Sequence, residues 1–208
     1  MVESQIRTNK VTDQRVITAF EAVPRELFVD EAKRGFAYVD EDLEVAVGRY
    51  LMEPMVLARL LHAAAPQPGD IVLDIGCASG YSTAVLAQLA ETVVGLESDR
   101  HLMGEANRTL NALDVDNAVV VEGALNEGYQ KQAPFNVIMF QGAVSAVPEA
   151  VKRQLADGGR LVAVVCDEAG IGRGTLIQRA GDSFSARILF DAATPLLPGF
   201  AREAGFVF

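Results

Sequence analysis

From about residue 53 onward, short apolar runs alternate with segments of helical periodicity, and this alternation constrains the fold more than any other feature. The predicted strands are residues 71–75, 92–96, 118–121, 136–140 and 160–165. The predicted helices are residues 55–64, 81–89, 99–113 and 148–155. Such an alternation forms a mostly parallel, twisted sheet with helices on both faces. Two last runs, 174–179 and 184–190, predict an antiparallel hairpin at one edge. We therefore expect an α/β, Rossmann-like fold.

The first 50 residues lack this alternation. Helical spacing at residues 12–22 predicts one helix, with Thr12 as its N-cap and Pro24 just beyond its end. A short helical stretch is expected near residues 30–34. Because 208 residues suit one domain of ordinary size, we expect a single domain over 1–208. In this division, residues 1–50 are a helical appendage on a core formed by residues 51–208.

The charge of the chain argues against two classes of partner. A net charge of −10 repels phosphate backbones and anionic lipid, and the basic residues are scattered along the sequence. No apolar run approaches the roughly 18 residues of a membrane helix, and the polar N-terminus does not resemble a signal peptide. We expect a cytoplasmic protein with no nucleic-acid or membrane partner.

Cysteine and histidine are too sparse for a metal centre. Cys77 and Cys166 are the only cysteines, and we expect free thiols at both. Neither His62 nor His101 has a second histidine or cysteine at ligand spacing. The sequence therefore predicts no metal site.

The loop after the strand at 71–75 carries the first candidate site, because open sheets bind ligands beyond the carboxyl ends of their strands. Its candidate cofactor-binding residues are Asp74, Gly76, Cys77, Ala78, Ser79, Gly80 and Tyr81. Gly76 and Gly80 let a ligand approach the main chain closely. A nicotinamide fingerprint requires a glycine where Ala78 stands. Asp74 would repel a pyrophosphate but suits the ammonium group of S-adenosylmethionine (SAM). This loop favours SAM as the cofactor.

The following loops complete the expected pocket. Glu97 ends the second strand, where a carboxylate can accept both ribose hydroxyls of an adenosine. The alternative role of Glu97 is the N-cap of the next helix, but Ser98 or Asp99 is the better candidate for that cap. Gly123, Ala124 and Leu125 fall where an adenine would be held, and Gln141 would line the methyl end. Together these residues predict the Rossmann-like fold of a SAM-dependent methyltransferase.

Residues 74–87 (DIGCASGYSTAVLA) resemble the first motif of the protein-L-isoaspartate O-methyltransferases. Further landmarks of that family occur in order at residues 23–29, 37–40, 48–54, 133–135 and 154–161. The resemblance thus covers nearly the whole chain, including the N-terminal appendage. It implies methyl transfer from SAM to the α-carboxylate of isoaspartyl residues in damaged proteins, a repair reaction.

Two positions depart from the family's pattern. Its substrate loop typically reads Gly-Gln-Thr-Ile-Ser-Gln-Pro, whereas residues 48–54 read GRYLMEP and put Met52 at the position of the active-site serine. The family's Gly-Asp-Gly appears as Gly123-Ala124-Leu125, without the aspartate. A methionine cannot donate the hydrogen bond that a serine gives to a carboxylate. Arg49 could clamp a carboxylate instead, or it could be a solvent-exposed arginine.

These departures leave three functions open: an isoaspartyl methyltransferase of reduced activity, a methyltransferase of the same lineage with another acceptor, and a SAM-binding protein without catalysis. The sequence does not predict the oligomeric state. The apolar tail at residues 195–208 could cover the edge hairpin or meet another subunit.

Overall fold

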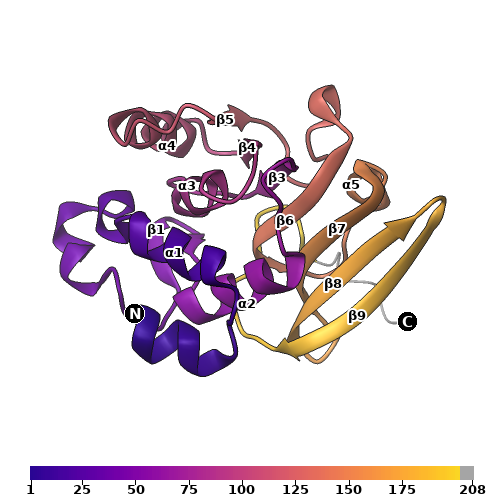
Figure 1. Ribbon diagram of the computed structural model, residues 1–208, viewed down its shortest axis with the longest axis horizontal. Coiled ribbons are helices and arrows are strands. Elements are labelled where there is room, and N and C mark those ends of the chain that lie inside the picture. The colour runs from indigo at the N-terminus through magenta and orange to yellow at the C-terminus, as the bar shows by residue number, and fades with distance from the viewer. Residues whose placement is uncertain (202–208) are drawn as a thin grey trace, which may run out of the picture.

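A computed structural model describes residues 1–201 and contains a seven-stranded sheet of order β5-β4-β3-β6-β7-β8-β9 (Figure 1). The strands are β3 (Ile71–Ile75), β4 (Thr92–Glu97), β5 (Ala118–Glu122), β6 (Phe135–Val144), β7 (Leu155–Cys166), β8 (Gly172–Ala180) and β9 (Ser183–Asp191). Strands β3 to β7 pair in parallel, and β8 and β9 add an antiparallel hairpin at one edge. The predicted α/β architecture and the edge hairpin are confirmed.

The helices of the core are α2 (Pro54–Ala64), α3 (Tyr81–Ala87), α4 (Arg100–Ala112) and α5 (Glu149–Lys152). Helix α2 has proline in its first turn, and Asp99 caps α4 by accepting the backbone N–H groups of His101 and Leu102. The prediction for α5 was too long, because Leu155 pairs with Phe135 and already belongs to β7.

Alternate residues of β3 enter two apolar clusters, one on each face of the sheet. Val72 belongs to the cluster that includes residues of α2, α3 and α4, whereas Leu73 belongs to the cluster that includes Val151 of α5 and the segment that follows β9. Helices cover both faces, as predicted, but unequally. The second face depends on the chain segment around Leu197 and Phe200 for part of its cover.

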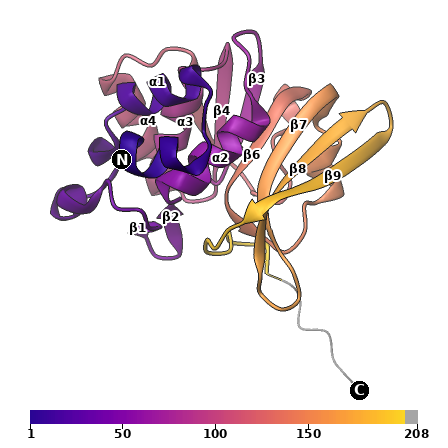
Figure 2. The ribbon, with the colours of Figure 1, turned by 60° about the horizontal axis from the view of Figure 1, so that its bottom comes forward.

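The N-terminal elements gather around α2 and α3 (Figures 1 and 2). They are a π-helical turn (Val2–Ile6), α1 (Gln14–Ala22), short 3-10 helices at Arg7–Asn9, Arg25–Phe28 and Glu31–Phe36, and the hairpin of β1 (Leu43–Ala46) and β2 (Arg49–Leu51). Thr12 is not the cap of α1. Asp13 is, because its carboxylate accepts the backbone N–H of Arg15 at 2.9 Å. The hairpin was not predicted from the sequence.

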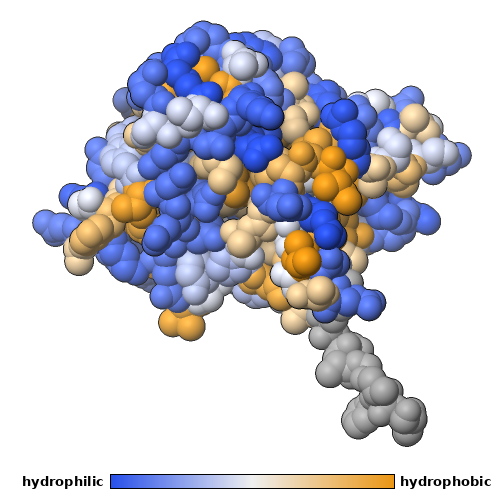
Figure 3. All heavy atoms as spheres, turned by 90° about the horizontal axis from the view of Figure 1, so that it is seen from below, coloured by the Kyte–Doolittle hydropathy of each residue, from blue (hydrophilic) through white to orange (hydrophobic). Residues whose placement is uncertain are grey.

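The surface seen in Figure 3 is largely hydrophilic, and apolar residues gather beside the point where the described chain ends. Lys10, Arg59 and Arg187 line one groove of about 410 Å³ together with His62 and the apolar residues Ala63, Leu189 and Phe190. Within residues 1–201, no helix has both the length and the apolar character needed to span a bilayer.

Arg25 ties the N-terminal elements to the core. It is fully buried, with Nε donating to the carbonyl of Ala37 at 2.7 Å and Nη2 to that of Met52 at 2.9 Å. Its guanidinium also lies 4.7 Å from the centre of the Tyr81 ring. One side chain therefore fixes the 3-10 helices, the loop before α2 and the start of α3 relative to one another.

We expect Arg25→Ala to lower the free energy of unfolding by about 2–4 kcal/mol, because two buried carbonyls lose a charged donor. Urea denaturation measures this loss. The exposed Arg34→Ala is the matched control and should change stability by less than about 0.5 kcal/mol. Equal stability of the two variants would show that Arg25 does not hold the appendage.

Candidate cofactor site

The carboxyl ends of β3, β4 and β6 meet where the strand order reverses, between β3 and β6, which is the usual ligand crevice of an open sheet. Gly76 and Gly80 have φ values of +75° and +93°, so the loop depends on glycine at both positions. Gly76 donates its backbone N–H to Leu96 at 2.8 Å and joins the first loop to the end of β4. The fold thus brings the predicted loops together.

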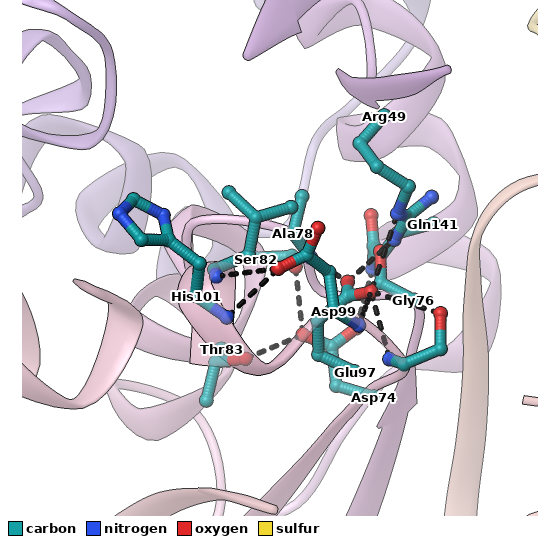
Figure 4. A network of polar contacts seen from close by, with 12 residues as sticks. Arg49, Asp74, Gly76, Ala78, Ser82, Thr83, Glu97, Asp99, His101 and Gln141 are labelled. Atoms are coloured by element: carbon teal, nitrogen blue, oxygen red, sulfur yellow. Dashed lines mark hydrogen bonds and ion pairs between the residues drawn. The ribbon is translucent and has the colours of Figure 1, made fainter. Parts of the chain in front are cut away.

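Asp74 is fully buried beneath this loop. Its Oδ2 accepts the hydroxyls of Ser82 and Thr83, each at 2.7 Å, and its Oδ1 accepts the Gln141 amide at 2.6 Å (Figure 4). Burial raises the pKa of Asp74 to about 6, against the opposing effect of these three donors. All of its hydrogen-bond partners come from the chain itself. Ser82 and Thr83 were not singled out from the sequence.

Glu97 is also fully buried and lies at the end of β4. Its carboxylate accepts the backbone N–H groups of Ala78 and Ser98 at 2.8 Å and of Asp99 at 3.1 Å. The helix cap is Asp99, so Glu97 has no capping role in α4. A carboxylate at this edge of the sheet is in the position from which such folds bind the ribose of a nucleotide cofactor.

The side chain of Arg49 extends from β2 into this network and lies against the carboxylate of Glu97 (Figure 4). Its Nη2 lies 2.5 Å from Glu97 Oε2 and donates to the carbonyl of Gly76 at 2.8 Å, while Nε is 3.3 Å from Oε1. Arg49 is 4% exposed, so it is not the solvent-exposed arginine that the sequence allowed. Because its guanidinium already binds Glu97 and Gly76, it has no free pair of N–H groups with which to bind a substrate carboxylate.

Met52 is buried beside the first loop. It lines a cavity of about 10 Å³ with Cys77, Tyr81 and Gln141, which is room for about one water molecule. Burial raises the pKa of the Cys77 thiol well above its ordinary value, so this cysteine stays protonated. Within residues 1–201, no three His, Cys, Asp or Glu side chains group as metal ligands.

The remaining predicted residues lie at the margins of this network. Ser79 donates its hydroxyl to the carbonyl of Phe28 at 2.6 Å and so faces the N-terminal elements. Gly123 donates its backbone N–H to the carbonyl of Glu97 at 3.0 Å. Ala124 is exposed, and Leu125 packs into the cluster on the second face of the sheet.

The segment after β9 enters the site, which the sequence did not predict. Ala143 donates its N–H to Pro195, and Leu197 donates its N–H back to Ala143, each at 2.9 Å. The buried side chain of Leu197 lies so near the first and fourth loops that a Cβ added at Gly76 or Gly142 would come within 2.8 Å of it. Residues 195–200 therefore cover the carboxyl edge of the sheet rather than the hairpin. Residues 202–208 of the predicted tail lie outside the described residues.

Comparison with known proteins supports the sequence resemblance. The family model described as Protein-L-isoaspartate(D-aspartate) O-methyltransferase matches residues 1–188. The chain belongs to this family. It is 39% identical to the protein-L-isoaspartate O-methyltransferase of Methylorubrum extorquens over 202 residues, which is 96% of this chain and 87% of the relative. The corresponding protein of Aeromonas salmonicida is 38% identical over 94% of this chain and 95% of its own.

A solved structure supports the fold of the family. It is a beta-aspartate methyltransferase from Plasmodium falciparum in complex with S-adenosyl-L-homocysteine. It superposes on 94% of this chain and 95% of its own with a TM-score of 0.80, at 20% identity.

We expect the buried Asp74 to make stability pH-dependent. Asp74 in the unfolded chain ionises near its ordinary pKa of 3.8, but the folded chain holds the proton up to about pH 6. Folding therefore binds a proton in this window, and stability falls as the pH rises through it. The unfolding free energy of wild type should drop by about 2 kcal/mol relative to Asp74→Asn between pH 4 and 6.5.

Chemical denaturation across this pH range measures the difference between the two proteins. The exposed Asp116→Asn is the matched control for the same chemical change. Parallel pH curves for wild type and Asp74→Asn would contradict the raised pKa.

Proposed function

We propose that this chain is a SAM-dependent methyltransferase that acts on the α-carboxylate of isoaspartyl residues in proteins. The observation that carries the proposal is Glu97, a buried carboxylate held by three main-chain N–H groups beside the glycine loop. Family membership supports the reaction and the protein substrate. The proposal includes a single domain over residues 1–208 and a cytoplasmic location.

The residues at the site fit SAM by their chemistry. Glu97 would hold the ribose hydroxyls, and the main chain of Gly76 to Gly80 would border the rest of the molecule. When bound, SAM supplies a methyl group carried on a positively charged sulfur. In the present conformation Arg49 and Leu197 take the space beside Glu97 and Gly76.

The acceptor needs no strong base, because a carboxylate is already ionised at pH 7. The work of the protein is alignment of the acceptor and exclusion of water. Met52 and Gln141 line the small cavity beside the first loop, so one apolar and one amide side chain would face the acceptor. The thioether of Met52 excludes water but donates no hydrogen bond.

Two features of the substrate loop favour a second function, a SAM-binding protein with weak catalysis or none. The loop offers no hydroxyl at position 52, and Arg49 is engaged with Glu97 rather than free for an acceptor. A member of the lineage with another acceptor is a further alternative. All three functions share the cofactor and differ in the acceptor.

We expect wild-type protein to methylate an isoaspartyl peptide slowly and its aspartyl twin not at all, as measured with radiolabelled SAM. Met52→Ser should raise the rate by at most about 10- to 200-fold, the effect of one hydrogen bond to a charged group. Met55→Ser on α2 is the matched control and should not raise it.

A wild-type rate that Met52→Ser does not improve would show that Met52 is harmless. Absence of transfer in every variant, with SAM bound and the protein folded, would refute the isoaspartyl reaction. In that case, consumption of SAM in the presence of cell extract would distinguish another acceptor from a non-catalytic role.

A further inference from the structure

We infer that two side chains of this protein occupy its own cofactor site. Arg49 takes the place of the ribose on Glu97, and Leu197 fills the crevice between β3 and β6. SAM binds only when both side chains are displaced. The inference rests on the proposed function and deepens it, because it concerns how the same site is controlled. Three observations support it independently.

The first observation is that Glu97 has no acceptor position left. Its Oε2 accepts from Ala78 N and Arg49 Nη2. Its Oε1 accepts from the N–H groups of Ser98 and Asp99, and Arg49 Nε and the Ser98 hydroxyl each lie 3.3 Å from it. A carboxylate offers about four lone-pair positions. A ribose on Glu97 therefore requires the departure of Arg49, which frees the remaining acceptor position. The three main-chain donors would remain and would still stabilise the buried charge of Glu97 after Arg49 leaves.

The second observation is the lack of space at the switch point of the sheet. Leu197 is 3% exposed, and its Cδ2 lies 2.8 Å from the position of a Cβ at Gly76. Its Cγ lies equally near such a position at Gly142. These glycines make room for a leucine side chain of this same chain. The cavity beside them is about 10 Å³, whereas small-molecule sites are typically about 300 Å³ or more.

The third observation is that neither occupant belongs to the seven-stranded sheet. Arg49 lies on the separate two-stranded sheet of β1 and β2. Leu197 lies in an irregular segment held by an isolated bridge to Ala143. Further anchors of this segment are a 3.1 Å hydrogen bond from Thr194 to Asp42, one from Ser145 N to Phe200 O, and the packing of Phe200 on Phe140. Opening the site breaks these contacts and withdraws Leu197 from the apolar cluster on the second face.

The consequence is a lowered apparent affinity for the cofactor. When only a fraction of molecules is open, the apparent Kd rises by the inverse of that fraction. Loss of either occupant raises the open fraction and tightens binding. Loss of both should have the larger effect.

The test is calorimetric titration of S-adenosylhomocysteine into wild type, Arg49→Ala, Leu197→Ala and the double variant. We expect each single variant to bind S-adenosylhomocysteine at least about 10-fold more tightly than wild type, since each loses a buried contact that holds the site closed. Arg49→Gln, whose shorter and uncharged side chain stays polar but cannot form the ion pair with Glu97, replaces Arg49→Ala if the latter does not fold. Glu97→Gln added to the double variant should abolish the gain.

Two control variants test whether the gain is local. Leu196→Ala alters the adjacent leucine of the same segment, which is 44% exposed. Arg160→Ala breaks the ion pair with Asp70 at the amino ends of the strands, away from the site. Neither should change the affinity. A gain in either control equal to that of Arg49→Ala would attribute the effect to general loosening and overturn the inference.

Hydrogen exchange gives a readout that does not depend on activity. Saturating S-adenosylhomocysteine should speed exchange of the Leu197 amide in wild type, because the segment leaves Ala143, and should slow it in residues 76–80. Slower or unchanged exchange at Leu197 would overturn the inference. Wild type binding as tightly as the double variant would overturn it as well and leave the proposed function intact. No binding by a folded double variant would refute both.

Discussion

Two carboxylates, Asp74 and Glu97, are buried at the same edge of the sheet, and the rest of the site depends on how each is compensated. Burying an unpaired charge is costly, so hydrogen-bond donors must come from elsewhere in the chain. Asp74 draws them from α3 and β6 and thereby fixes the helix and the switch point to each other. Glu97 draws three main-chain donors from the loops after β3 and β4, and Arg49 completes its shell. The separate β1–β2 hairpin, which also packs into the core through Leu43 and Leu51, is thus joined to the end of β4 by an ion pair.

The sequence predicts the sheet well because each strand is a local apolar run between helical segments. It fails where pairing depends on a distant residue. Leu155 follows α5 but pairs with Phe135, which shortens the helix. The β1–β2 hairpin is short, and β2 buries the charged Arg49 as well as Leu51, so its sequence shows no apolar alternation. Asp13 and Thr12 are both plausible caps, and only the backbone geometry distinguishes them.

The same limit applies to the site. The glycine loop and Glu97 follow directly from the positions of β3 and β4, and their proximity could be predicted. Arg49 is 48 residues from Glu97, and Leu197 is farther still from Gly76, so no local pattern indicates either contact. The substitutions relative to the family's substrate loop are visible in the sequence. What Arg49 does there becomes evident only from its contacts with Glu97 and Gly76.

The order of the chain adds a consequence for how the protein is made. Strands β3, β4 and β6, with the loops that end them, precede Leu197 along the sequence, so the ribosome delivers the crevice before it delivers the residue that fills it. A domain folds as a unit, so the segment around Leu197 joins a sheet whose parallel strands have all been made before it. The side chain that fills the crevice is therefore among the last parts of the site to be made.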